Sequence, residues 1–256
     1  MKEIKRRLLS GETLFGCWLN VGCPVCAEIV GAAGFDWVLV DLEHGAGTEK
    51  DALHQLQALE SGTAAAVVRV ESGARQRIQR VLDYGAEGVM VPRIDRPDQA
   101  REAAAALRYP PKGNRGVAKM VRASGFGKDF DRYCRESQEK ILGVIQIETE
   151  ECLKHLDEIA AIEGVDVLFV GPADLSLALG VPGRLEHPRF ASAARLTAEA
   201  AGRAGKAAGV LLYGPEQLEA YRALGFRFIA CGADSAFVAT GARNTIEALR
   251  KGKKPS

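Results

Sequence analysis

Three ionisable side chains follow one short apolar segment near the start of this chain. The segment, residues 37–40, has the length and composition of a buried strand, and Asp41, Glu43 and His44 come directly after it. Charged groups at such a boundary are costly to desolvate unless they are paired or used. Because histidine titrates near neutral pH, His44 is a candidate acid or base, with Asp41 fixing its tautomer. The alternative is an acidic loop that caps the next helix.

Two further carboxylates, Glu148 and Asp174, follow later apolar segments, and no cysteine or histidine lies beside either of them. Carboxylate oxygens suit a hard divalent ion such as Mg²⁺ or Mn²⁺, with water and substrate completing the coordination. Asp174 could instead cap the helix after it. The spacing therefore leaves both a metal site and a helix cap open.

Arg69 ends a segment that is otherwise Ala-Val-Val, so its guanidinium needs an anionic partner. That partner is either a substrate carboxylate or an internal one, from Glu43 or Glu148. None of the twelve lysines lies at the end of an apolar segment. A Schiff-base mechanism needs a desolvated lysine, so carbonyl chemistry here would use a metal as the electrophile.

Eight short apolar segments, alternating with amphipathic ones, would position these residues. The predicted strands are residues 14–20, 36–42, 64–70, 88–92, 141–147, 165–170, 209–212 and 226–231. The predicted helices are residues 23–33, 48–60, 75–84, 95–107, 129–139, 149–161, 188–208, 215–224 and 234–250. No linker divides them, so the pattern predicts one α/β domain over residues 1–256, a closed (β/α)8 TIM barrel. An open doubly wound sheet should carry a glycine-rich fingerprint after its first strand, and residues 20–24 carry none.

Composition and charge exclude several other classes of function. The chain carries 34 basic and 33 acidic residues, a net charge of +1, which predicts neither a nucleic-acid surface nor a membrane-binding patch. No apolar stretch has the length of a membrane span, and the charged start lacks the apolar region of a signal peptide. The six cysteines predict reduced thiols and a cytoplasmic protein. Cys23 and Cys26 are an exception, because a dithiol at the start of a helix can be redox-active, and the sequence does not decide this.

Several segments together resemble the HpcH/HpaI aldolase family, over residues from about Leu14 to Leu249. The matching segments are residues 16–19 (GCWL), 34–37 (GFDW), 41–44 (DLEH), 110–117 (PPKGNRGV), 146–149 (QIET) and 170–175 (VGPADL). This family contains class II, metal-dependent pyruvate aldolases, such as 4-hydroxy-2-oxoheptanedioate aldolase and 2-dehydro-3-deoxyglucarate aldolase. The resemblance implies a carbon-carbon lyase of aromatic or sugar-acid catabolism. It would cleave a 4-hydroxy-2-oxo acid reversibly to pyruvate and an aldehyde through a metal-stabilised enolate.

The resemblance also implies a role for each matching residue. The metal, Mg²⁺, Mn²⁺ or Co²⁺, would be held by Glu148 and Asp174, with Glu43 in the shell around it. The keto oxygen of pyruvate would be bound by Arg69, and the acid or base would be His44, oriented by Asp41. The rest of the substrate site would comprise Gln146, Pro172 and Ala173 at pyruvate and Leu212 at the aldehyde.

Further implications concern assembly and substrate. The resemblance implies a homohexamer, a trimer of dimers, whose terminal helix at about residues 234–250 is exchanged between subunits. Apart from the resemblance, the candidates to hold a distal anion of the substrate are Arg93, Arg115, Arg122 and Lys119, and for at least two of them the favoured alternative is a surface salt bridge. The alternative function is another metal-enolate lyase or synthase of the same barrel superfamily, of the citrate-lyase or phosphoenolpyruvate-mutase type, whose motifs match less well.

Overall fold

Eight parallel strands form a closed barrel in the computed structural model, which describes residues 1–251. The strands are β1 (Leu14–Leu19), β2 (Trp37–Asp41), β3 (Ala65–Arg69), β4 (Gly88–Val91), β5 (Leu142–Ile147), β6 (Val167–Val170), β7 (Ala207–Leu212) and β8 (Phe226–Ala233). Each strand pairs with the next along the chain, and β1 closes the barrel against β8, with Leu14 opposite Phe228. The predicted (β/α)8 barrel is confirmed.

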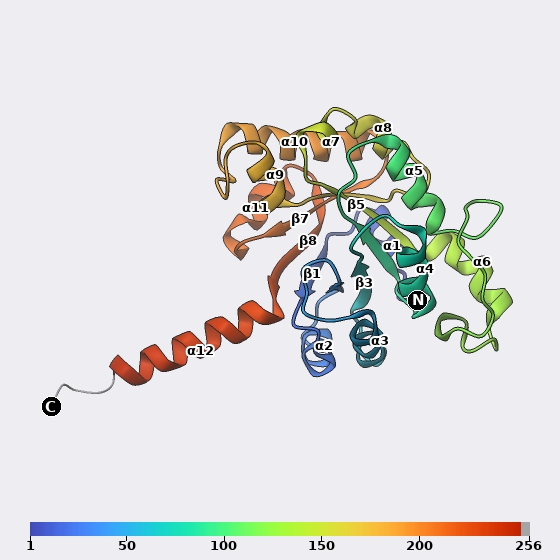
Figure 1. Ribbon diagram of the computed structural model, residues 1–256. Helices are drawn as coiled ribbons and strands as arrows, with labels where there is room; N and C mark the ends of the chain where they lie inside the picture. Colours follow the sequence, from blue (N-terminus) through green and yellow to red (C-terminus); the bar gives the residue numbers. More distant parts are fainter. Residues whose placement is uncertain (252–256) are drawn as a thin grey trace.

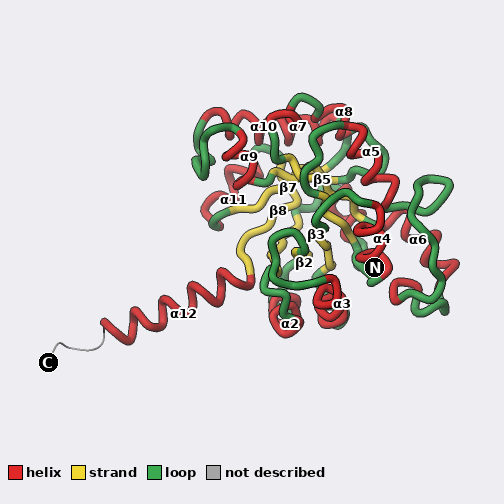
Figure 2. Tube along the Cα trace, in the orientation of Figure 1, coloured by secondary structure: helices red, strands yellow, loops and turns green. Residues whose placement is uncertain are grey.

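The strands are connected by helices, most of which surround the barrel on its outside (Figures 1 and 2). They are α1 (Ile4–Leu9), α2 (Pro24–Gly31), α3 (Glu49–Ala58), α4 (Arg75–Asp83), α5 (Pro97–Ala106), η1 (Arg122–Ser124), α6 (Phe130–Lys140), α7 (Glu150–Leu153), α8 (Leu156–Ala160), α9 (Pro172–Ala178), α10 (Pro188–Arg203), η2 (Pro215–Gln217), α11 (Leu218–Ala223) and α12 (Asp234–Lys251). Three predicted helices differ from those observed, one of them being the helix predicted at 215–224, which is divided into η2 and α11. The helix predicted at 149–161 is divided into α7 and α8, and α10 ends at Arg203 because the chain turns at Gly205, whose φ is +68°.

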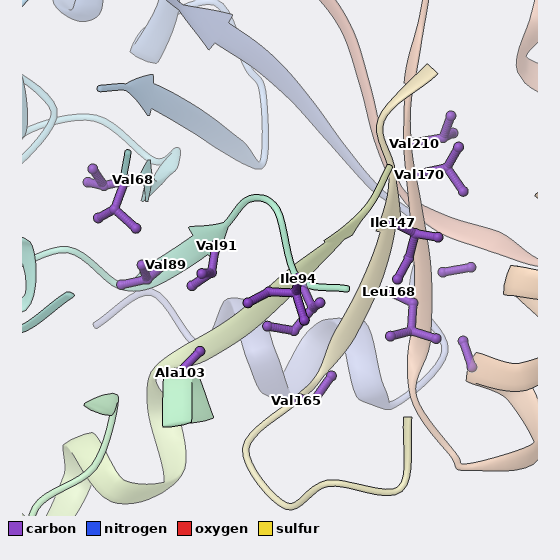
Figure 3. Close-up of a cluster of buried hydrophobic side chains, with 14 of the residues drawn as sticks. Val68, Val89, Val91, Ile94, Ala103, Ile147, Val165, Leu168, Val170 and Val210 are labelled. Carbon is purple, nitrogen blue, oxygen red and sulfur yellow. The ribbon is translucent and has the colours of Figure 1, made fainter. Parts of the chain in front are cut away.

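Both faces of the barrel strands are apolar because both are covered, as parallel sheets require. The outward-facing side chains form one buried cluster with the helices, which Figure 3 shows around Val68, Val89, Ile147, Val170 and Val210. The inward-facing side chains fill the barrel itself and include four aromatic rings, from Trp18, Trp37, Phe169 and Phe228. At the carboxyl ends this inner set becomes polar.

The amino-terminal end of the barrel is closed by α1, a helix that the sequence analysis did not predict. Ile4 and Leu8 pack into the inner cluster, and the ammonium group of Lys5 lies 2.9 Å from the Asp166 carboxylate. Barrel enzymes carry their chemistry at the opposite end, at the carboxyl ends of the strands.

The last helix, α12, extends away from the barrel instead of packing on it (Figure 1). Its first residue, Asp234, is its only buried residue, and its carboxylate accepts hydrogen bonds from the backbone N–H groups of Asn20 and Val21. Phe237 and Val238 are exposed on it. Within residues 1–251, no helix combines the length and the apolar character needed to cross a membrane.

Candidate active site

Asp41 and Arg69 form a buried ion pair at the carboxyl ends of β2 and β3. The two residues are register partners in adjacent strands, so their side chains start from the same level of the barrel. Arg69 donates from Nε to Asp41 Oδ1 at 2.9 Å and from Nη2 to Oδ2 at 2.8 Å, the two-pronged geometry in which arginine binds carboxylates best. Burial lowers the pKa of Arg69, but the Asp41 carboxylate more than offsets this, and the guanidinium stays charged. Beneath it, the ring of Trp18 lies 5.8 Å from the guanidinium carbon.

Glu43 is the second acidic neighbour of Arg69. Its Oε2 lies 2.9 Å from Arg69 Nη1, an ion-pair distance, but no donor is aligned to hydrogen-bond with this buried oxygen. Burial raises the pKa of Glu43, and the charge of Arg69 opposes that rise. Of the two internal partners considered for Arg69, Glu43 is the one observed, together with Asp41.

His44 lies at the rim, with 68% of its side chain exposed. Asp41 was expected to orient the imidazole ring, but its Oδ1 instead accepts the backbone N–H groups of Glu43 and His44, at 3.0 and 3.3 Å. That expectation is wrong because the carboxylate of Asp41 is already taken up by Arg69. The carboxylate beside the ring is that of Glu43, whose Oε2 lies 4.0 Å from His44 Nε2.

Glu148 is a buried carboxylate without a cation. Gln146 donates from Nε2 to its Oε1 at 2.8 Å, and the backbone N–H of Arg93 donates to its Oε2 at 3.1 Å. Among residues 1–251, no basic side chain lies within ion-pair distance of this carboxylate, although only 3% of the residue is exposed. Burial raises the pKa of Glu148; the Arg93 N–H opposes this, and the charge of Asp174 adds to it.

Asp174 lies in the first turn of α9, after Gly171 and Pro172. The start of this helix adjoins Glu148, because a Cβ on Gly171 would lie 3.0 Å from Glu148 Oε1, and the negative charge of Asp174 raises the pKa of both Glu148 and Glu43. Within the part of the chain that the structure describes, its carboxylate has neither a hydrogen bond nor an ion pair, and it caps no helix. The helix-cap alternative is therefore not what the structure has.

The donor set fits a divalent cation held through oxygen. Glu148 lies beside Gly171 at the start of the helix that carries Asp174, and within residues 1–251 neither carboxylate has an ion-pair partner, although the charge of Arg69 favours the ionised form of Glu148. A divalent ion would relieve the repulsion between the two carboxylates. Gln146 Oε1, also buried in this region, has no hydrogen-bond partner. No cluster of three or more histidine, cysteine or acidic residues suited to a metal occurs within residues 1–251, so two carboxylates would leave the remaining positions to water and substrate.

Of the other predicted residues, some lie at the carboxyl end of the barrel, called the mouth below, and the others lie elsewhere in the protein. Pro172 is buried and Ala173 is exposed at the start of α9, next to Asp174. Leu212 is 3% exposed and packs in the cluster between barrel and helices, whereas Leu211 packs against the inner cluster. This packing does not by itself bring Leu212 to a substrate.

Of the four cationic candidates for a distal anion, Arg93 is the one placed beside Glu148. Arg115 is buried, with Nη2 2.7 Å from Asp83, and Arg122 donates to the backbone oxygen of Tyr84 and to Glu60. Lys119 lies against Gly127 in the long connection. Arg93, whose φ is +57°, donates its backbone N–H to Glu148. The sequence does not predict this hydrogen bond, because every residue except proline has a backbone N–H.

Comparisons with known proteins agree on one family. The family described as HpcH/HpaI aldolase/citrate lyase matches residues 14–240. A 2-keto-3-deoxy-L-rhamnonate aldolase of Shigella sonnei (strain Ss046) is 37% identical over 250 residues, which cover 97% of this chain and 93% of the relative. A family protein from Burkholderia cenocepacia J2315 has a crystal structure that matches with a TM-score of 0.93 and 35% identity, over 98% of this chain and 100% of that one. The structure of the citrate synthase SbnG matches with a TM-score of 0.87 and 25% identity, over 98% of both chains.

Proposed function

This chain belongs to the HpcH/HpaI aldolase/citrate lyase family, and we propose that it cleaves a 4-hydroxy-2-oxo acid to pyruvate and an aldehyde. The observation that carries the proposal is that two acidic side chains at the carboxyl end of the barrel, Glu148 and Asp174, have no ion-pair partner within residues 1–251, and that Arg69 ends a strand at the same end. The relative named as a 2-keto-3-deoxy-L-rhamnonate aldolase supports a substrate from this class, a 3-deoxy-2-oxo acid derived from a sugar.

Glu148 and Asp174 would hold the divalent metal of this family, for which we propose Mg²⁺ or Mn²⁺, because the ligands are hard oxygens. When bound, the ion supplies Lewis acidity at the carboxylate and keto oxygen of the substrate. Gln146 and the Arg93 N–H keep the two oxygens of Glu148 fixed, which orients one ligand before the metal arrives.

Arg69 would stabilise the charge that develops on the keto oxygen. Its Nε and Nη2 are bound by Asp41, which fixes the plane of the guanidinium, while Nη1 makes no aligned hydrogen bond to Glu43. A rigid donor aimed at a developing oxyanion is worth about 10²- to 10³-fold in rate. Asp41 is therefore proposed as the residue that positions Arg69.

The proton transfers of the aldol cleavage are proposed for His44 and Glu43. Cleavage requires a base to take the proton of the 4-hydroxyl, after which the C3–C4 bond breaks, its electron pair forms the enolate, and the aldehyde leaves. A proton delivered to C3 of the enolate then gives the methyl group of pyruvate. We propose His44 as this acid and base, with Glu43 beside its ring.

We assign the remaining residues of the substrate site from their positions relative to Glu148 and Asp174. Gln146, Pro172 and Ala173 would surround the pyruvate half, because they adjoin Glu148 and Asp174. The aldehyde half is proposed to lie toward the end of β7, near Leu212.

Release of pyruvate tests the proposal directly. A panel of 4-hydroxy-2-oxo acids should yield pyruvate, EDTA should abolish the activity, and Mg²⁺ or Mn²⁺ should restore it. Borohydride with substrate should leave no covalent adduct, since no lysine serves the reaction. Glu148→Gln should lose metal-dependent turnover, while Glu150→Gln, on the exposed surface of α7 beside Arg189, should retain it. A borohydride adduct, or full activity in Glu148→Gln, would refute the assignment.

The similarity to a citrate synthase favours one alternative, a related lyase or synthase that also forms an enolate. Such an enzyme would release no pyruvate from any member of the panel. The same assay therefore separates the two functions.

We also propose that α12 packs on a second copy of the chain, within a hexamer built as a trimer of dimers. The helix leaves Phe237, Val238, Ile246 and Leu249 exposed, with none of them covered by its own barrel. Deleting residues 237–256 should reduce the mass of the assembly measured by sedimentation, and an unchanged mass would contradict the proposal.

The free state of all six cysteines supports a cytoplasmic location.

A further inference from the structure

Cys23 and Cys26 lie at the start of α2, at the mouth end of the barrel. Cys23 is the residue before the helix, Pro24 is its first residue, and Cys26 is its third. Cys23 has the extended backbone of a helix-capping residue, with φ −101° and ψ 121°, a geometry that turns the side chain toward the N–H groups of the first helical turn. Because Cys26 is the third residue of that turn, the two thiols lie at the same helix start, as in redox-active Cys-X-X-Cys pairs.

The two thiols differ in their surroundings, although both are free and partly exposed. Hydrogen bonding from the backbone N–H groups of Cys26 and Val25 lowers the pKa of the Cys23 thiol, as does the thiol of Cys26. Burial and the neighbouring Cys23 raise the pKa of Cys26. One member therefore resembles an attacking thiolate and the other a protonated partner.

We propose that Cys23 and Cys26 form a redox-active dithiol that is oxidised by small-molecule disulfides. The Cys23 thiolate attacks one sulfur of the disulfide RSSR and releases RS⁻, leaving a mixed disulfide. Cys26 loses its proton to that leaving thiolate, attacks the Cys23 sulfur and releases the second RS⁻, which takes a proton from water. In sum, two protein thiols and RSSR give one protein disulfide and two RSH, and the protein gives up two electrons and two protons.

The pair is not a structural zinc site within the described residues, where no cluster of three or more suitable ligands occurs. Its place also connects it to the active-site rim. The backbone oxygen of Asn20 accepts the N–H of Ala46, at 2.8 Å, in the loop after His44. A Cβ on Gly22 would lie 2.7 Å from Cα of Gly47, so the segment before Cys23 packs directly on that loop.

Mass spectrometry after treatment of the full chain with glutathione disulfide tests the proposal. In the wild-type protein, alkylation should label two fewer thiols than in the reduced protein, and peptide mapping should find Cys23 joined to Cys26. Cys26→Ser should stop at one glutathione adduct on Cys23. Cys23→Ser should form its adduct about tenfold more slowly, because the Cys26 thiol is protonated. Cys134→Ser, in α6, should behave as the wild-type protein does.

Two results would overturn the proposal. One is full alkylation of the wild-type protein after oxidation, a measurement that does not depend on whether any variant folds. The other is equal adduct rates at Cys23 and Cys26 in the two single variants. The double variant Cys23→Ser/Cys26→Ser should retain pyruvate release, since neither thiol contacts the residues proposed for the aldol reaction. Failure of this inference is thereby separate from failure of the proposed function.

Discussion

Gly171→Ala should weaken metal binding without changing a single charge. A methyl group at this position would lie 3.0 Å from Cγ and 3.0 Å from Oε1 of Glu148, and 3.5 Å from Nε2 of Gln146. Carbon atoms in contact prefer about 3.5–4.0 Å, so the Glu148 side chain must shift by a few tenths of an ångström. The backbone of Gly171, at φ −86° and ψ 97°, suits alanine, so the perturbation acts on the side chain of Glu148 and not on the main chain.

Displacing the groups that orient a metal ligand costs about 10- to 100-fold in metal affinity, or about 1.4–2.7 kcal/mol. Titration of the metal-free protein with Mn²⁺ by calorimetry measures this loss, and turnover at saturating metal should recover in part. Gly202→Ala is the matched control, because a Cβ there meets no atom within 4 Å. An unchanged Mn²⁺ affinity in Gly171→Ala would show that Glu148 is not a ligand, or that its position is not set by this contact.

Three further perturbations test the rest of the site. Arg69→Ala removes the partner of the buried Asp41 carboxylate, so the free energy of unfolding should fall by about 3–5 kcal/mol and kcat by about 10²-fold or more. Denaturant unfolding measures the first and pyruvate release the second. If both quantities stayed unchanged, the ion pair would be refuted. His44→Gln should lower turnover by about 10²-fold or more while changing stability by less than about 0.5 kcal/mol, because the side chain is mostly exposed. In EDTA, the folded state holds a proton on Glu148 at a pH where the unfolded state, with a glutamate pKa of about 4.3, has released it. The wild-type protein should therefore gain stability relative to Glu148→Gln as pH falls from 7.5 toward about 4.3, and a constant difference across this range refutes the raised pKa.

Much of the fold could be predicted because it depends on local pattern. Eight short apolar segments separated by amphipathic ones leave few arrangements that cover both faces of every strand, and the barrel is one of them. The helix α1 was missed because its buried residues, Ile4 and Leu8, sit in a highly charged segment and find their apolar partners inside the barrel. The break between α7 and α8 was missed because Lys154 and His155 carry no helix-breaking signal.

The chemical composition of the site was also present in the sequence, since the type of residue at each strand end follows from the strand boundaries. The pairing of those residues was not. Asp41 was expected to hold the ring of His44, three residues away, and it binds Arg69, 28 residues away, instead. Hydrogen bonding between neighbouring strands made that choice, because it places Asp41 and Arg69 in register.

The sequence by itself determined the eight-stranded barrel and the types of the acidic residues that follow its strands. Only the tertiary structure decided which carboxylate is neutralised and which is not. Asp41 and Glu43 share the charge of Arg69, while Glu148 receives an amide and a backbone N–H but no cation. The physical reason is that strand register sets which groups are within hydrogen-bonding distance. At a buried position, that distance decides whether a charged side chain is paired with an opposite charge inside the protein.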